Sequence, residues 1–149
     1  MSQRILCVCL GNICRSPAAE VALREKLPGF EIDSAGTAGW HVGKPPYGPM
    51  QEAASTQNMD LSDLCARQIS SDDFNTFDLI LVMDQQNKSD VEALRPPGSA
   101  TQVALFASED VPDPYYTRDF DEALDIIQAA AETWADQLQV ASADAAKRL

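Results

Sequence analysis

A cysteine and an arginine near the start of the chain have the spacing that phosphate chemistry requires. Cys9 closes a short apolar run, five residues follow, and Arg15 and Ser16 open a segment of helical character. Backbone N–H groups of such a loop point inward and bind an anion, and a helix N-terminus adds further donors. A guanidinium group matches two oxygens of a phosphate. The spacing therefore predicts Cys9 as a nucleophile and Arg15 as a phosphate clamp.

Each remaining part of this loop has an expected use. The positive surroundings favour the thiolate of Cys9, because they lower the pKa of the thiol. Ser16 is expected to hydrogen-bond the sulfur, Gly11 to adopt a backbone angle that other residues resist, and Asn12 to adopt a left-handed conformation and brace the loop. A buried strand cysteine beside an unrelated arginine is the structural alternative, which the strand–loop–helix context disfavours. The predicted phosphate-binding loop comprises Leu10, Gly11, Asn12, Ile13, Cys14 and Ser16.

Strands and helices alternate along the rest of the chain. Apolar runs rich in Val, Ile and Leu predict buried strands, and apolar residues three and four apart predict helices. Ser16 is predicted to cap the first helix with Pro17 at its first position. Residues 36–49 and 108–117 are predicted to be loops. The predicted strands are 4–10, 30–35, 79–83 and 102–105, and the predicted helices are 17–27, 50–58, a short one near 70–74, 86–94 and 119–138 or beyond.

This alternation predicts an α/β fold formed by a single domain of residues 1–149. We expect a four-stranded parallel sheet of flavodoxin-like order 2-1-3-4, with helices on both faces. Ligands of such sheets bind beyond the carboxyl ends of the strands, where the strand order reverses. The first strand-to-helix turn lies at that place and carries Cys9.

Composition excludes several classes of partner. The net charge is −12, and an acidic surface repels nucleic acids and anionic membranes. The N-terminus lacks the apolar core of a signal peptide, and no apolar run approaches the ~18 residues of a membrane helix, so we expect a cytoplasmic protein. The chain has four cysteines but no C-x-x-C motif and a single histidine, His41, so no zinc site is predicted. We predict no metal, no cofactor and a monomeric state.

Several segments together resemble the low-molecular-weight protein tyrosine phosphatase family. Residues 8–17, VCLGNICRSP, resemble the signature of that family. Further similarities are D-S-A-G at 33–36, the tryptophan-bearing segment 40–42, A-R-Q-I at 66–69 and D-P-Y-Y at 113–116. The resemblance covers the whole chain. It implies hydrolysis of phosphotyrosine in a tyrosine-phosphorylated protein, through a cysteinyl-phosphate on Cys9.

The resemblance also assigns roles to residues outside the loop. Asp113 is the implied general acid that protonates the departing tyrosyl oxygen and then acts as base for water. Ser34 is implied to support Asn12 and Ser16. Trp40, Tyr115 and Tyr116 are implied to line an aromatic slot, which favours tyrosyl over seryl phosphate; the alternative for Trp40 is a side chain packed on the core.

Two positions leave alternatives open. Cys14 matches a family cysteine that forms a reversible disulfide with the nucleophile, but a small buried filler fits the position equally. Cys7 and Cys65 are expected to be structural. Leu64 stands where the family commonly has a histidine that holds the loop asparagine, so Asn12 needs other support.

Two other functions compete with the phosphatase. An arsenate reductase on the same fold would also use Cys9, although residues 84–88 lack the cysteines of its thioredoxin-coupled form. A non-catalytic phosphopeptide-binding module would not need both Cys9 and Asp113. The choice among phosphoprotein, phosphoarginine and small phosphate esters is also open.

Overall fold

A computed structural model of the chain describes residues 3–147, and the predicted domain extends beyond them to residues 1–2 and 148–149. Its centre is a four-stranded parallel sheet of order β2-β1-β3-β4, which confirms the predicted topology. The order reverses at β1, so the turn that follows β1 lies at the expected binding position. The strands are β1 (Arg4–Cys9), β2 (Glu31–Gly36), β3 (Leu79–Val82) and β4 (Gln102–Leu105).

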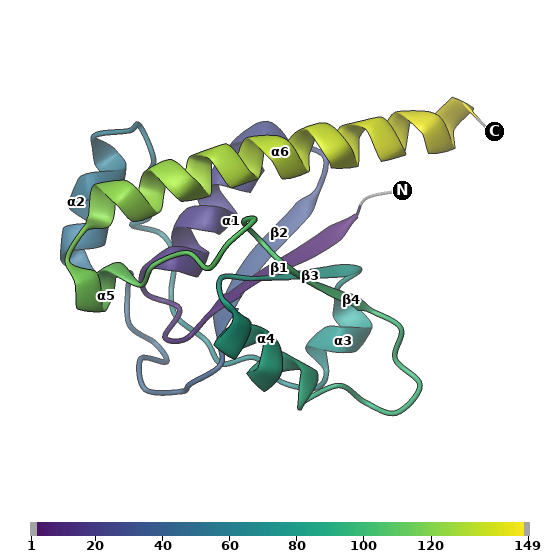
Figure 1. Ribbon diagram of the computed structural model, residues 1–149, viewed down its shortest axis with the longest axis horizontal. Coiled ribbons are helices and arrows are strands. Elements are labelled where there is room, and N and C mark those ends of the chain that lie inside the picture. Colours follow the sequence, from purple (N-terminus) through teal and green to yellow (C-terminus); the bar gives the residue numbers. More distant parts are fainter. Residues whose placement is uncertain (1–2, 148–149) are drawn as a thin grey trace.

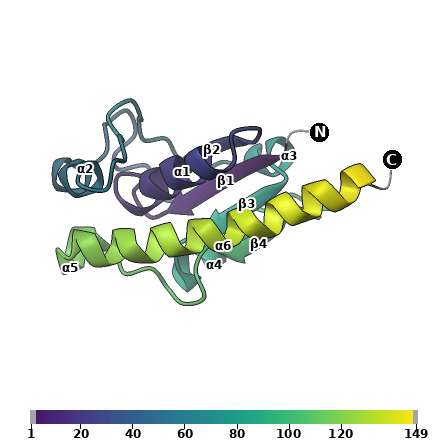
Figure 2. The ribbon, with the colours of Figure 1, turned by 90° about the horizontal axis from the view of Figure 1, so that it is seen from above.

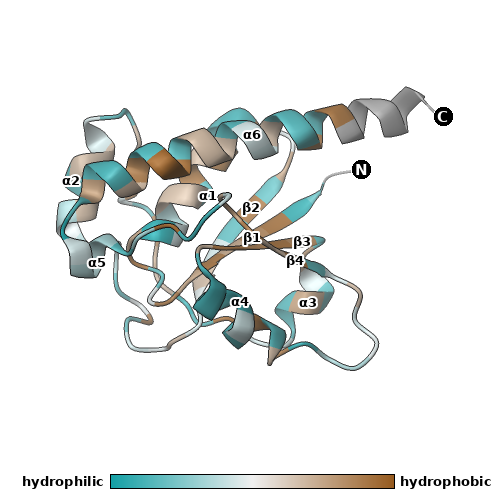
Figure 3. Cartoon of the chain, in the orientation of Figure 1, coloured by the Kyte–Doolittle hydropathy of each residue, from teal (hydrophilic) through white to brown (hydrophobic). Residues whose placement is uncertain are grey.

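Helices cover both faces of the sheet, as the apolar strands predict. Alternate residues of β1 point to opposite faces: Cys7 belongs to the core under α1 and α6, whereas Leu6 and Val8 belong to the core under α3 and α4. Figures 1 and 2 show α6 running the length of the molecule beside α1. In Figure 3, β1 and β3 are mostly hydrophobic in colour, whereas α4 is largely hydrophilic. The helices are α1 (Arg15–Lys26), α2 (Gly48–Ser55), α3 (Asp73–Thr76), α4 (Gln85–Glu92), α5 (Pro114–Thr117) and α6 (Phe120–Lys147).

The longest helix, α6, buries the predicted apolar stripe. Leu124, Ile127 and Ala131 are fully buried, at spacings of three and four residues. The indole N–H of Trp134 donates a hydrogen bond of 2.7 Å to the carbonyl of Phe106. Within residues 3–147, no helix is both long and apolar enough to cross a membrane.

Two local predictions were wrong. Helix α1 begins at Arg15 with Cys14 as its N-cap, and no side chain caps it, because the Ser16 hydroxyl is engaged at the Cys9 sulfur instead. The segment predicted as a loop at 108–117 contains the short helix α5, whose N-cap Asp113 accepts a hydrogen bond from the Tyr115 N–H.

Candidate active site

The loop that joins β1 to α1 is fixed against the end of β2. The N–H of Thr37 donates to the carbonyl of Cys9 at 2.9 Å, and the N–H of Ala38 donates to the carbonyl of Leu10 at 2.9 Å. A Cβ on Gly36 would lie 2.8 Å from the Leu10 carbonyl oxygen, so only glycine allows this approach. The loop therefore has a backbone position set by the neighbouring strand.

The sulfur of Cys9 receives two polar contacts from this loop. The Asn12 N–H donates to the sulfur at 3.2 Å, and the hydroxyl of Ser16 lies 3.0 Å from it. Asn12 has the predicted left-handed conformation, with φ of 56°. Gly11 does not have a positive φ, so its predicted backbone angle was wrong. A Cβ at this position would lie 3.0 Å from Cδ2 of His41, so a larger residue would require the His41 side chain to shift.

The side-chain amide of Asn12 sets the direction of the hydrogen bonds around the sulfur. Its Oδ1 accepts from the backbone N–H of Arg67 at 3.0 Å, which fixes the orientation of the amide. Nδ2 therefore donates to both serine hydroxyls, to Ser16 at 2.8 Å and to Ser34 at 3.0 Å. Because Ser16 accepts from Asn12, its own hydrogen is available for one of two acceptors, the Cys9 sulfur at 3.0 Å or the carbonyl of Ala35 at 3.4 Å, and the sulfur is the nearer. Such a bond stabilises a thiolate.

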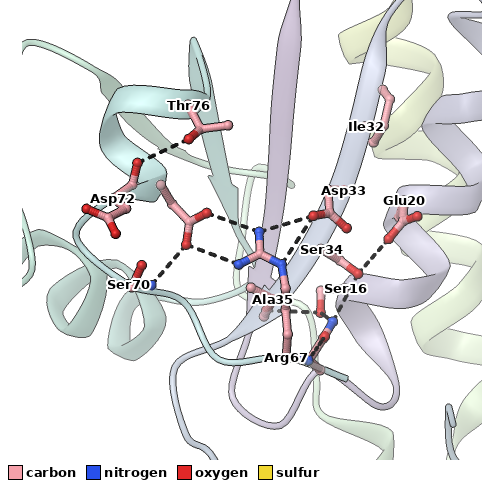
Figure 4. Close-up of polar contacts among 12 residues, drawn as sticks. Ser16, Glu20, Ile32, Asp33, Ser34, Ala35, Arg67, Ser70, Asp72 and Thr76 are labelled. Atoms are coloured by element: carbon pink, nitrogen blue, oxygen red, sulfur yellow. Dashed lines mark hydrogen bonds and ion pairs between the residues drawn. The ribbon is translucent and has the colours of Figure 1, made fainter. Parts of the chain in front are cut away.

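This chain of hydrogen bonds ends at a buried carboxyl group on α1. Ser34 donates to Glu20 at 2.7 Å (Figure 4). Arg24 pairs with the other oxygen of Glu20 at 2.6 Å. Burial raises the pKa of Glu20, although the bond from Ser34 and the charge of Arg24 oppose the shift. The Oδ1 atom and both Nδ2 hydrogens of Asn12 are thus hydrogen-bonded, although position 64 is a leucine and not a histidine.

Arg67 holds the segment that supports Asn12. Its guanidinium makes two bonds to Asp73, at 3.1 and 3.2 Å, and pairs with Asp33 at 3.1 Å (Figure 4). Its carbonyl accepts from the N–H of Gly36 at 2.8 Å. These contacts hold the backbone at Arg67 against the end of β2. They therefore fix the position of the Arg67 N–H that donates to Asn12.

Arg15 is almost fully buried, and its guanidinium is held by two carboxylates. Nη1 donates to Asp84 at 2.7 Å and to the carbonyl of Val111 at 2.9 Å, and Nη2 donates to Asp113 at 3.3 Å. Burial would lower the pKa of Arg15, but Cys9, Asp84 and Asp113 together raise it, so the group stays charged. Among the described residues, its buried Nε has no hydrogen-bond partner. A phosphate oxygen is the kind of acceptor that would satisfy it.

Asp84 contacts Arg15 but was not among the site residues predicted from the sequence. Its Oδ1 accepts from the N–H of Asn87 at 2.7 Å and so caps α4, while Oδ2 binds Arg15. The available signal was an acidic residue directly after β3, at the edge of the sheet where the carboxyl ends of the strands meet.

A cavity of about 260 Å³ opens above the Cys9 sulfur. Trp40 is 67% exposed, which excludes the alternative that it packs on the core. His41, for which the sequence predicted no catalytic or binding role, also lines the cavity. Four predicted site residues do not line the cavity. Asn12 and Ser16 contact the Cys9 sulfur, and Arg15 contacts Asp113. Ser34 lies one step further away, bonded to Asn12. The lining residues are Cys9, Leu10, Gly11, Ile13, Cys14, Trp40, His41, Asp113, Tyr115 and Tyr116.

The other cysteines differ in exposure. Cys7 and Cys14 are buried, and burial raises the pKa of both thiols. Cys65 is exposed, so the expectation that it is structural was wrong. No disulfide joins any pair of the four.

Comparisons with known proteins show which family this chain is similar to. Residues 4–144 match the family model described as low molecular weight phosphotyrosine protein phosphatase. The low molecular weight protein-tyrosine-phosphatase YfkJ of Bacillus subtilis is 36% identical over 141 residues, covering 86% of this chain and 90% of its own length.

Solved structures are similar over nearly the whole chain. The crystal structure of YfkJ has a TM-score of 0.86 and covers 93% of this chain and 96% of its own, at 34% identity. The structure of Vibrio vulnificus Wzb in complex with benzylphosphonate has a TM-score of 0.84 and covers 92% of this chain and 99% of its own, at 32% identity.

Proposed function

This chain belongs to the low-molecular-weight protein tyrosine phosphatase family, and from that premise we propose that it hydrolyses phosphotyrosine through a cysteinyl-phosphate on Cys9. The observation that carries the proposal is the place of Cys9 at one cavity with Asp113 and the aromatic side chains. Arg15 adds a buried Nε that has no hydrogen-bond partner among residues 3–147, and its Nη2 donates to the carboxylate of Asp113. These are the parts that a two-step phosphoryl transfer needs.

In the first step, the Cys9 thiolate attacks phosphorus and the bond to the tyrosyl oxygen breaks. Asp113, in its acid form, gives its proton to that oxygen, so tyrosine leaves neutral. Arg15 and the loop N–H groups stabilise the negative charge of the phosphoryl oxygens. The enzyme then carries the phosphoryl group on sulfur.

In the second step, water attacks the same phosphorus and the bond to sulfur breaks. Asp113, now a carboxylate, takes the proton of the water, and inorganic phosphate leaves. The sulfur departs as a thiolate, which the Ser16 hydroxyl stabilises from 3.0 Å.

The aromatic lining of the cavity supports a tyrosyl rather than a seryl substrate. Trp40, Tyr115 and Tyr116 provide walls for a ring, and a short seryl ester would reach Cys9 without filling them. Benzylphosphonate, bound by the similar Wzb, has its phosphorus one atom from an aromatic ring, as phosphotyrosine does, with a carbon in place of the ester oxygen.

We further propose that Cys14 forms a reversible disulfide with Cys9 under oxidation. Peroxide would convert the Cys9 thiolate to a sulfenic acid, and the Cys14 thiol would then displace water to form the S–S bond. Both cysteines lie on one loop at one cavity, which supports the pairing. The monomeric state and the cytoplasmic location stay predictions from the sequence.

The test is hydrolysis of matched peptides that carry phosphotyrosine, phosphoserine or phosphoarginine. We expect turnover of the phosphotyrosyl peptide, none by Cys9→Ser, and an Asp113→Ala loss that is largest for poor leaving groups. Preference for the phosphoarginyl peptide would replace the proposed substrate. No turnover of any peptide would contradict the function, and arsenate reduction coupled to glutaredoxin would then be assayed.

A further inference from the structure

A second cavity of about 360 Å³ lies beside the first and shares a wall with it. Three residues line both cavities, namely Ile13, His41 and Tyr115. The remaining wall of the second cavity is the segment 44–48, which includes two prolines and Tyr47. A substrate chain that leaves the phosphotyrosine cavity on this side has to pass along that segment.

Lys44 brings a positive charge to the lining of the second cavity, although the protein is strongly acidic. Residues 34–51 contain no aspartate or glutamate, although the chain has 23 acidic residues. Lys44 is exposed on this segment, and none of the ion pairs among the described residues involves it. Arg118 lies over the ring of Tyr47 and donates to its hydroxyl at 3.0 Å, likewise without an ion pair among those residues.

Backbone hydrogen bonds hold this wall in place. The N–H of Ala66 donates to the carbonyl of Lys44 at 2.8 Å, and the N–H of Lys44 donates to the carbonyl of His41 at 2.9 Å. The N–H of Tyr47 donates to the carbonyl of Ile13 at 2.8 Å, which ties the wall to the catalytic loop. The backbone at Lys44 is thus fixed relative to Cys9 before any substrate binds, which reduces the ordering cost of recognition.

We propose that the second cavity is a subsite for an acidic side chain near the phosphotyrosine of the substrate. This inference rests on the proposed phosphatase function. The methylene groups of a glutamate would pack on the prolines and Tyr47, while its carboxylate would pair with Lys44. An apolar side chain would fill the same walls but leave Lys44 without a partner, so charge decides between the two occupants.

The test compares phosphotyrosyl peptides that carry Glu, Gln or Leu at one position within three residues of the phosphotyrosine. The readout is the ratio of kcat/KM for the Glu peptide to that for the Gln peptide, measured in the same enzyme. At one position we expect a ratio of about two to five at low salt, the range of an exposed ion pair. The ratio should fall toward one as salt rises. General repulsion by the net charge of −12 predicts the opposite, a ratio below one that rises with salt.

Two variants complete the experiment. Lys44→Ala should bring the ratio to one or below, and Lys44→Glu should bring it lower still. Lys88→Ala, on α4 and outside both cavities, removes the same charge and should keep the wild-type ratio.

Three results would overturn the subsite: a ratio of one or less at every position, an unchanged ratio in Lys44→Ala, or a Leu peptide that exceeds the Glu peptide. Turnover of the Gln peptides keeps these results separate from the function itself. If no Gln peptide is hydrolysed, the phosphatase function fails and the subsite fails with it.

Discussion

Nη1 of Arg15 lies 2.7 Å from Oδ2 of Asp84, although 69 residues separate the two in sequence. The contact joins the turn after β1 to the turn after β3, which neighbour each other because β1 and β3 pair in the sheet. The carboxylate of Asp84 binds Nη1 of the guanidinium, while the buried Nε has no hydrogen-bond partner among the described residues. Asp84 therefore positions Arg15, the proposed phosphate clamp.

Asp84→Asn should weaken phosphate binding and slow turnover. Asparagine keeps an acceptor to cap α4 but loses the charge that holds Arg15, so the clamp is less well oriented. We expect kcat/KM to fall roughly 10- to 100-fold, the size of a lost charged hydrogen bond. Inhibition by inorganic phosphate should weaken in parallel. Asp90→Asn, elsewhere on α4, serves as the control, and unchanged phosphate inhibition in Asp84→Asn would contradict the positioning role.

Ser16→Ala should slow the breakdown of the cysteinyl-phosphate more than its formation. The hydroxyl lies 3.0 Å from the Cys9 sulfur and accepts from Asn12, so its hydrogen can be donated to the departing thiolate, which is nearer than the Ala35 carbonyl at 3.4 Å. We expect kcat to fall roughly 10- to 100-fold. Rapid mixing with a chromogenic aryl phosphate should then reveal a burst of product.

Ser55→Ala, at the exposed end of α2, controls for the loss of a hydroxyl elsewhere. Equal slowing of both steps by Ser16→Ala, with no burst, would show that Ser16 only shapes the loop.

The sheet and the predicted phosphate-binding loop could be recognised in the sequence because the patterns that indicate them span only a few neighbouring residues. The strand ending at Cys9 is a continuous apolar run, and the loop and helix follow it directly. The predicted loop cysteine, asparagine and serine do contact one another. Local pattern is enough where the residues that interact are also close in sequence.

Other features of the site could not be predicted because they depend on distant contacts. The support of Asn12 comes from a backbone N–H at Arg67, and no side-chain pattern reports such a donor. Helix α5 has only four residues and ends at Arg118 in a left-handed conformation, with φ of 64°, which arginine rarely adopts. The need for glycine at position 36 follows from the loop that packs on it and not from its own strand.

Cys14→Ala should make inactivation by peroxide harder to reverse. In the wild type we expect a thiol reductant to restore most activity, because the Cys9–Cys14 disulfide protects the sulfur from further oxidation. Without Cys14, a larger fraction should stay inactive as the sulfinic acid. Mass spectrometry of peroxide-treated protein would identify either product.

The pH dependence of this protection provides a second check. Burial raises the pKa of the Cys14 thiol, so only a small fraction is thiolate at neutral pH. Disulfide formation should therefore accelerate as the pH rises from 7 toward 9.

If a thiol reductant restores the same fraction of activity in wild type and in Cys14→Ala after peroxide treatment, the result would support the alternative that Cys14 is a buried filler.

Glu20 should make stability depend on pH in the direction opposite to that of most paired carboxylates. Burial raises the pKa of Glu20 in the folded state above the usual 4.5, despite the bond from Ser34 and the charge of Arg24. The folded state therefore holds the Glu20 proton more tightly than the unfolded state. The stability from this group is fully present below pH 4.5 and is lost as the pH rises through the folded pKa.

Glu20→Gln removes this titration but keeps an acceptor for Ser34. Urea unfolding of both proteins between pH 4 and 8 gives the difference in unfolding free energy, wild type minus variant. We expect this difference to decrease as the pH rises from about 4.5 and to become constant above the folded pKa. Glu25→Gln, on the exposed side of α1, is the matched control and should show no comparable decrease. A difference that increases with pH would mean that Arg24 and Ser34 stabilise the carboxylate by more than burial destabilises it.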